Sequence, residues 1–347
     1  MKAAVMTTLR SPLEVQNISD PTPGPADAVI QVEACGICRS DWHTWQGDFK
    51  SDLPLVMGHE FGGTIEDIGK DVKHFKAGDR VTVPFHMACG RCAYCYSGQS
   101  NICMKLGTIG VDFNGGFAQL ASVPEADVNL VHLPEEVDAL SAAAIGCRFM
   151  TAYHGVIDRG QIKPGEWVTI FGIGGVGLSA VQIASVAGAR VIAVDVSDQK
   201  LALAEREGAI HTINAAQDDP VQAIKTLTQG GADMSMDALG SSVTAGPAIK
   251  SLRKGRRHVQ IGLTTKSETE TGEISLPTDL MTMKEIRFIG SLGCPPASYI
   301  GMLALIANGR LDPKRLVTEE VALEDTSRVL SSMSAYATIG FHIITKW

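Results

Sequence analysis

Four cysteines fall within fifteen residues of one polar, glycine-containing segment. Cys89, Cys92, Cys95 and Cys103 have the spacing C-x2-C-x2-C-x7-C. Four thiolates from one loop can surround a tetrahedral Zn²⁺ ion at about 2.3 Å and leave no coordination position open, so such a site is structural. Disulfides are one alternative, which a reducing compartment disfavours. An iron–sulfur cluster is the other, although Met104 stands where ferredoxin-type spacing would have proline.

Three further residues of types that bind metals lie far apart in the chain: Cys38, His59 and Cys147. Two cysteines and one histidine, with water in the fourth position, form a known catalytic zinc arrangement. Spacing alone does not predict that these three residues meet, because a single cysteine is usually a small buried hydrophobe. Cys35 and Cys294 have no evident role.

A glycine-rich turn joins a strand-like run at residues 168–171 to a helical stretch at 176–187. Gly172, Gly174, Gly175 and Gly177 give the pattern G-x-G-G-x-G. In a βαβ unit, the first glycine permits the tight turn, the second lets a diphosphate approach the backbone, and the last allows close helix–strand packing. The diphosphate would lie at the positive helix N-terminus. The pattern predicts a dinucleotide-binding site.

An acidic residue, Asp195, ends the next strand-like run, 18 residues after Gly177. A carboxylate there accepts hydrogen bonds from the adenosine ribose and repels a 2′-phosphate, which favours NAD over NADP. No arginine follows closely, and Lys200 is the nearest base. The alternative is an ordinary acid at the end of a strand.

The chain changes character along its length. Short β-branched runs at 28–32, 63–68 and 80–83 predict a strand-rich first part. Beyond residue 149, strand-like runs at 168–171, 190–195, 233–238 and 258–262 alternate with helical stretches, one of them between Ser197 and Gly208. That alternation predicts an α/β fold with a doubly wound parallel sheet. The tail holds an amphipathic run at 299–307 and an apolar strand at 339–344, and we expect it to return to the first domain.

Composition excludes several classes of protein. The 347 residues are 45% hydrophobic and 20% charged, with a net charge of −8. Such a chain can build cores, and it has no positive field to bind nucleic acid. Residues 167–189 carry no charge, but the glycine cluster interrupts them, so we expect no membrane span there. The N-terminus does not resemble a secretory signal, and we expect a cytoplasmic protein.

Three motifs together carry a family resemblance. Gly58-His59-Glu60 begins the pattern G-H-E-x2-G-x5-G-x2-V, Cys38-x-Ser40-Asp41-x-His43 precedes it, and the four-cysteine loop follows it. With these motifs, essentially the whole chain resembles the zinc-dependent alcohol dehydrogenases of the medium-chain dehydrogenase/reductase superfamily. The resemblance implies a GroES-like β-rich catalytic domain (residues 1–148 and 291–347) and a nested Rossmann NAD-binding domain (149–290), with the active site in the cleft between them.

The resemblance also implies two zinc ions per chain and a set of site residues. Cys38, His59 and Cys147 would bind the catalytic zinc, and Cys89, Cys92, Cys95 and Cys103 the structural one. Glu60 would lie behind the catalytic metal, Asp41 would fix the tautomer of His59, and Ser40 and His43 would relay a proton.

Coenzyme and substrate contacts follow from the same resemblance. Arg39 would reach the coenzyme diphosphate, Thr151 and Val176 the nicotinamide, and Lys200 the adenosine ribose, with Gly262 and Leu263 as further coenzyme contacts. Phe85 matches a substrate-pocket position. Trp42, Trp45 and Phe49 are further candidates for that pocket, or else surface or core aromatics. Gly115 follows Cys103 by only twelve positions, without the insertion of dimeric animal and plant relatives, which implies a homotetramer.

The implied reaction interconverts primary or secondary alcohols with aldehydes or ketones. Zinc would favour the alkoxide, which gives a hydride to the nicotinamide, while the proton leaves through Ser40, a coenzyme ribose hydroxyl and His43. A polyol dehydrogenase of the sorbitol or threonine type is the first alternative, although many of those lack the four-cysteine loop. The scattered metal ligands disfavour a zinc-free quinone reductase, and the intact relay disfavours a non-enzymatic NAD-binding protein.

Overall fold

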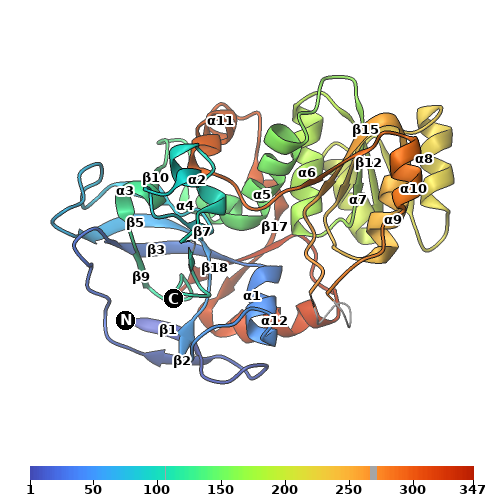
Figure 1. The fold of residues 1–347 in the computed structure, drawn as a ribbon. Helices are drawn as coiled ribbons and strands as arrows, with labels where there is room; N and C mark the ends of the chain where they lie inside the picture. The colour runs from blue at the N-terminus through green and yellow to red at the C-terminus, as the bar shows by residue number, and fades with distance from the viewer. Residues whose placement is uncertain (106, 266–271) are drawn as a thin grey trace. The chain divides into compact units, whose positions relative to one another are not determined.

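A computed structural model describes residues 1–105, 107–265 and 272–347 of the chain (Figure 1). These residues form two compact units. The first comprises Met1–Met150 and Gly293–Trp347, and the second comprises Thr151–Leu292. Each division lies two residues beyond the boundary expected from the sequence.

The first unit is built mainly from antiparallel strands. In the described residues its largest sheet has the order β10-β6-β5-β3-β18-β17, with β9 also paired to β3; β2-β1-β4 and β7-β8 form two smaller sheets. The strands are β1 (Lys2–Met6), β2 (Glu14–Asn17), β3 (Ala28–Ile37), β4 (Leu55–Val56), β5 (Glu60–Ile68), β6 (Arg80–Thr82), β7 (His86–Met87), β8 (Gly107–Thr108), β9 (Leu120–Val123), β10 (Val131–His132), β17 (Val317–Ala322) and β18 (Phe341–Lys346). The β-rich first domain is therefore confirmed.

Short helices connect these strands. They are α1 (Arg39–Gln46), α2 (Ala93–Tyr96), η1 (Ser100–Ile102), α3 (Ala126–Asn129), α4 (Ala139–Ala144), η2 (Ile145–Phe149), α11 (Pro296–Ala307), η4 (Pro313–Leu316), η5 (Leu323–Asp325) and α12 (Thr326–Ser334). The C-terminal strand β18 pairs antiparallel with β3 and parallel with β17. The tail thus completes the sheet of the first unit, as the sequence predicts.

The second unit is a parallel sheet with the strand order β13-β12-β11-β14-β15-β16 among the described residues. Counted from β11, this is the order 3-2-1-4-5-6 of the doubly wound Rossmann fold, which confirms the predicted fold class. The strands are β11 (Trp167–Phe171), β12 (Arg190–Asp195), β13 (His211–Asn214), β14 (Ala232–Asp237), β15 (Leu252–Gln260) and β16 (Arg287–Gly290). All residues of β11 and β14 are buried, as expected for central parallel strands.

Helices follow the strands of this sheet: α6 (Gly175–Val186), α7 (Asp198–Arg206), α8 (Pro220–Thr228), α9 (Ser242–Lys250) and α10 (Thr278–Met283), while α5 (Met150–Tyr153) and η3 (His154–Arg159) precede β11. Within the described ranges, no helix has the length and apolar character needed to cross a membrane. The uncharged stretch 167–189 is β11, the glycine turn and α6.

One strand begins earlier than its sequence suggests. β15 begins at Leu252, six residues before the predicted start, in a run of basic residues. Those charges are paired: the Arg257 guanidinium binds Glu166, and Arg253 and Arg256 bind Asp233. Because the partners lie elsewhere in the chain, hydrophobic periodicity did not reveal this part of the strand.

Candidate functional site

The helix α1 begins at a cysteine. Cys38 is its N-cap residue; its Sγ accepts the Ser40 N–H at 3.3 Å, while Asp41 Oδ2 accepts the Cys38 N–H at 2.8 Å. This reciprocal capping fixes the start of α1 directly after β3. It places Cys38 and Ser40 at the helix N-terminus and His43 one turn further along.

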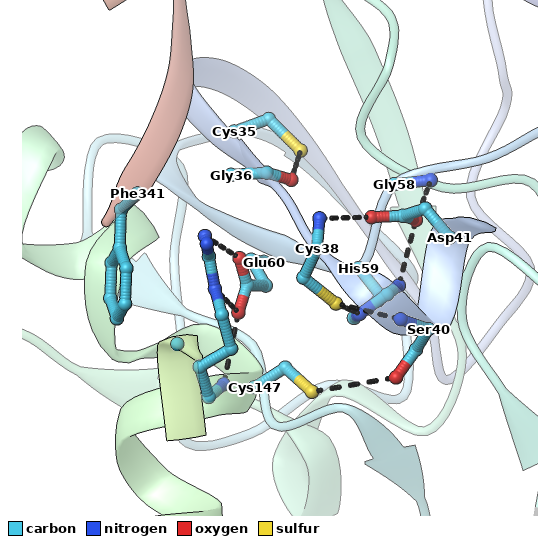
Figure 2. Close-up of polar contacts among 12 residues, drawn as sticks. Cys35, Gly36, Cys38, Ser40, Asp41, Gly58, His59, Glu60, Cys147 and Phe341 are labelled. Atoms are coloured by element: carbon cyan, nitrogen blue, oxygen red, sulfur yellow. Dashed lines mark hydrogen bonds and ion pairs between the residues drawn. The ribbon is translucent and has the colours of Figure 1, made fainter. Parts of the chain in front are cut away.

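A buried carboxylate orients His59. Asp41 Oδ1 lies 2.9 Å from His59 Nδ1 and accepts the Gly58 N–H at 3.2 Å, and both side chains are inaccessible to solvent (Figure 2). Asp41 holds one proton at Nδ1, so Nε2 is the nitrogen that faces Cys38 and can bind a metal once the ring has released its second proton. That Nε2 lies 2.9 Å from Cys38 Sγ.

Cys147 lies in a π-helical turn, η2, and its side chain lies close to Cys38 and His59. Two glycines allow this turn and the preceding helix α4 to pack closely against β5. A Cβ at Gly146 would lie 2.5 Å from the Glu60 Cα, and a Cβ at Gly62 would lie 2.3 Å from the Ala142 Cβ of α4. The ligand atoms of Cys38, His59 and Cys147 all lie within 4.8 Å of one another. Their residue types and proximity suit a tetrahedral zinc. Two sulfurs and one nitrogen around such an ion would be about 3.5–3.8 Å apart. The 2.9 Å between Cys38 Sγ and His59 Nε2 is shorter, so these two side chains would move apart as the ion binds.

The charge state of Cys38 suits metal binding. Burial opposes its ionisation, but hydrogen bonding to Cys147 and the charge of His59 hold the pKa of the Cys38 thiol well below its usual range. A thiolate beside an orienting imidazole is a soft ligand set that zinc prefers.

Glu60 directly follows His59 and is held by Arg148, which was not among the predicted site residues. The Arg148 backbone N–H and Nε each donate to Glu60 Oε1 at 2.9 Å, and Nη2 binds Oε2. Burial raises the pKa of Glu60 to about 7 against the opposing charge of Arg148. The guanidinium also stacks on Phe341, at 3.8 Å from the ring centroid.

Gly36 on β3 makes room for this pair. A Cβ there would lie 2.3 Å from Glu60 Oε2 and 3.0 Å from Arg148 Nη2. Arg148 directly follows Cys147, and this position beside a predicted metal ligand was the only feature of the sequence that could have indicated its role. Its partner is 88 residues away, and only the fold brings the two together.

The two predicted relay residues lie on one face of α1. Ser40 Oγ is 4.0 Å from Cys147 Sγ, and Thr44 donates to the Ser40 carbonyl. His43 Nδ1 lies 2.7 Å from Asp48 Oδ2. Asp48 was not among the predicted site residues. It directly follows Gly47 (φ 86°), the residue at which α1 ends.

The four aromatic candidates are in different environments. The Phe85 ring lies 4.3 Å from the His59 ring, and the Phe49 ring lies 5.8 Å from that of His43. Trp42 and Trp45 belong to the hydrophobic core of the first unit, and their indole N–H groups bind Ser334 Oγ and the Ser11 carbonyl. This packing favours the alternative that both tryptophans are core aromatics.

Arg39 is held within the first unit. Its guanidinium lies between the rings of Trp42 and Tyr336, at 3.6 and 4.4 Å from their centroids, and Nη1 donates to the Met333 carbonyl at 2.5 Å. The stacking orients the cation, and the expected diphosphate contact remains a prediction.

The four cysteines of the loop form a second compact cluster. Cys92 Sγ lies 3.5 Å from Cys95 Sγ and 3.7 Å from Cys103 Sγ, and Cys103 Sγ lies 3.5 Å from Cys89 Sγ. These separations match the edges of a tetrahedron around zinc, which are about 3.8 Å for Zn–S bonds of 2.3 Å. Hydrogen bonds from backbone N–H groups, that of Met104 foremost, lower the pKa of Cys92 to about 6.

The glycine turn has the geometry that its spacing predicts. Gly172 has φ 86°, and a Cβ at Gly177 would lie 1.9 Å from the Gly172 carbonyl oxygen. A Cβ at Gly174, the N-cap residue of α6, would meet no described atom within 4 Å. Gly174, Gly175 and Val176 therefore present an open helix N-terminus, which suits a diphosphate.

Asp195 ends β12 beside this turn. Its Oδ2 accepts the Ile173 N–H at 2.7 Å, and Oδ1 accepts the N–H groups of Val196 and Ser197. The carboxylate therefore shapes the glycine turn, and its expected contact with the adenosine ribose remains a prediction. Lys200 lies in α7, Thr151 in α5, and Gly262 and Leu263 follow β15.

Comparisons with known proteins match the whole chain. Residues 24–135 match the alcohol dehydrogenase GroES-like domain, and residues 175–308 match the zinc-binding dehydrogenase domain. An alcohol dehydrogenase of Geobacillus stearothermophilus is 36% identical over 96% of both chains. An NAD-dependent alcohol dehydrogenase of Sulfurisphaera tokodaii is 31% identical over 99% of both chains, and a sorbitol dehydrogenase of Halalkalibacterium halodurans is 32% identical over 92% of both. The solved alcohol dehydrogenase TADH from Thermus sp. ATN1 matches with a TM-score of 0.92 at 32% identity over the full length of both chains.

Proposed function

The chain belongs to the zinc-dependent alcohol dehydrogenases of the medium-chain dehydrogenase/reductase superfamily, and from this premise we propose that it interconverts alcohols with aldehydes or ketones, using NAD. One observation carries the proposal. Cys38, His59 and Cys147 come from three distant segments, yet their ligand atoms lie within 4.8 Å of one another, beside the Ser40 hydroxyl.

Bound zinc supplies a Lewis acid that favours loss of the substrate hydroxyl proton, and NAD supplies the acceptor for the hydride. Cys38, His59 and Cys147 hold the metal in this proposal. Asp41 keeps the His59 ring in the ligating tautomer, and Phe85 covers the ring and contributes an apolar wall for the substrate.

The proton leaves along α1. Ser40 Oγ, next to the metal ligands, accepts it, and His43, one turn further along the helix, releases it to solvent. Asp48 holds the His43 ring through Nδ1 at 2.7 Å. Histidine suits this step because its ordinary pKa of about 6.5 lies near neutrality.

The second unit binds the coenzyme. The N-terminus of α6, at Gly174 and Gly175, receives the diphosphate, and Asp195 accepts hydrogen bonds from the adenosine ribose. Lys200 contacts the same ribose, while Arg39 contacts the diphosphate. Thr151 and Val176 contact the nicotinamide, and Gly262 and Leu263 are further coenzyme contacts.

Two zinc ions per chain belong to the proposal, because the cluster of Cys89, Cys92, Cys95 and Cys103 has the separations of a closed site. Its role is to hold the loop, which has few other apolar partners in the described residues. A homotetramer and a cytoplasmic location remain predictions from the sequence.

A polyol dehydrogenase is the second candidate, and the 32% identity to a sorbitol dehydrogenase is consistent with it. The experiment is a panel of primary, secondary, aromatic and polyhydroxylated alcohols with NAD, followed by NADH absorbance. Faster oxidation of simple alcohols supports the first function, and a preference for polyols supports the second. A zinc-loaded enzyme that oxidises none of them, and reduces no corresponding carbonyl compound with NADH, would contradict both.

A further inference from the structure

A row of buried polar side chains crosses two strands of the second unit. Ser235 and Asp237 lie on β14, and they pair in register with His258 and Gln260 on β15. Because alternate residues of a strand face the same side, the four side chains lie on one face of the sheet. Ser235, Asp237 and His258 are completely buried.

The hydrogen bonds in this row have a defined direction. Gln260 Nε2 donates to Asp237 Oδ2 at 2.8 Å and to the Gly262 carbonyl at 3.0 Å. Gln260 Oε1 must therefore accept from His258 Nε2, which lies 3.1 Å away. Burial lowers the pKa of His258 and keeps the ring neutral, so its Nδ1 accepts from Ser235 Oγ at 2.9 Å.

The row ends on two backbone segments at the carboxyl edge of the sheet. Asp237 Oδ1 accepts the N–H groups of Leu239 and Gly240, at 2.9 and 3.2 Å. The Asp237 carbonyl accepts the N–H groups of Ile261 and Gly262. A Cβ at Gly262 would lie 2.1 Å from the Gly240 nitrogen, so the two segments are in direct contact.

Strand order places these segments opposite the adenosine position. The glycine turn follows β11 and Asp195 ends β12, whereas β14 and β15 lie on the other side of β11. A dinucleotide crosses the carboxyl edge of such a sheet where the strand order reverses, with one nucleotide on each half. The nicotinamide half therefore meets the ends of β14 and β15, where Leu239 and Leu263 are 36% and 50% exposed.

We propose that Asp237 and Gln260 are positioning residues for the nicotinamide half of the coenzyme. Together they hold the Leu239–Gly240 turn and the Ile261–Leu263 segment as one rigid platform. The inference rests on the proposed use of NAD, but it assigns a role to residues that do not touch the coenzyme. It requires that loss of the Gln260 hydrogen bonds affects the nicotinamide half and spares the adenosine half.

ADP-ribose, which lacks the nicotinamide ring, separates these two effects. Calorimetric titration of the full-length protein with NADH and with ADP-ribose would compare wild type with Gln260→Met, which keeps the length of the side chain. We expect Gln260→Met to weaken NADH binding about tenfold and to change ADP-ribose binding by less than about twofold. As the matched contrast, Asp195→Ala should weaken both ligands, because it acts on the adenosine half.

Asp237→Asn provides a second variant, since an asparagine NH₂ would oppose the NH₂ of Gln260 while its oxygen could still accept from the turn. It should show the same selective loss of NADH, with altered fluorescence of bound NADH. Equal weakening of both ligands, or no weakening of either, in a variant that folds would overturn the inference while leaving the proposed function intact. If the wild-type protein shows no measurable binding of either ADP-ribose or NADH, both the proposed function and this inference are contradicted.

Discussion

Arg148 binds Glu60 through both its backbone and its side chain. The N–H and Nε of Arg148 donate to the same oxygen, Oε1, at 2.9 Å each. The pair is almost completely buried, at 7% and 0% side-chain exposure. It joins the turn that carries Cys147 to the strand that follows His59, so two proposed ligand segments are held by one ion pair.

Removing the cation alone should destabilise this region. Arg148→Met would leave the Glu60 carboxylate buried without its partner, at a cost of about 3–5 kcal/mol in the free energy of unfolding. We expect a lower melting temperature and faster loss of zinc to a chelator. The double variant Arg148→Met/Glu60→Gln removes both charges and should recover part of the loss. Unchanged stability of the single variant would show that the pair does not hold the site.

Ser40→Ala tests the proton path. Loss of the hydroxyl should lower kcat by about 10²–10⁴-fold, the range typical of general acid–base groups, with little change in NADH affinity. Steady-state kinetics and NADH titration give the two numbers. Ser40→Thr keeps a hydroxyl and should retain much more activity; equal kcat in wild type and Ser40→Ala would remove Ser40 from the relay.

Asp195 should determine coenzyme choice. Asp195→Ala removes the carboxylate that would repel a 2′-phosphate, and also the acceptor of the Ile173 N–H. We therefore expect weaker NAD binding and a smaller ratio of kcat/KM between NAD and NADP. The kinetics with both coenzymes measure this ratio, and an unaltered ratio would mean that the ribose is recognised elsewhere.

His258 makes stability depend on pH with a defined sign. Burial lowers its pKa in the folded state below the value of about 6.5 expected in the unfolded chain. The unfolded state then binds more protons, so this contribution to stability is lost as the pH falls below about 6.5. Urea unfolding should show wild type losing at most about 1 kcal/mol relative to His258→Gln between pH 6.5 and 5.5, because the unfolded histidine is already half protonated at pH 6.5. A difference that stays constant would contradict the neutral histidine.

The sequence predicted those features that depend on neighbouring residues. Gly172 and Gly177 lie in one turn, and the four-cysteine cluster lies in one loop. In both cases the spacing along the chain was enough to predict the local geometry. The convergence of Cys38, His59 and Cys147 could be predicted only from the family resemblance. It depends on three separate segments and on the close packing at Gly62 and Gly146, which spacing does not show. Arg148 and Asp48 were not predicted. The contact of Arg148 with Glu60 depends on how the η2 turn packs on β5, and the contact of Asp48 with His43 depends on where α1 ends. The sequence left both a pocket and the core open for Trp45, and its packing in the core of the first unit favours the second.

Zinc content tests the central claim most directly. Metal analysis of the purified protein should find two zinc ions per chain, and Cys147→Ala should retain one, with loss of alcohol oxidation. Cys35→Ala is the matched control and should retain two zinc ions. Cys35 is also buried, on β3, and its Sγ donates to the Gly36 carbonyl at 3.6 Å. Two zinc ions and undiminished activity in Cys147→Ala would contradict a metal held by Cys38, His59 and Cys147.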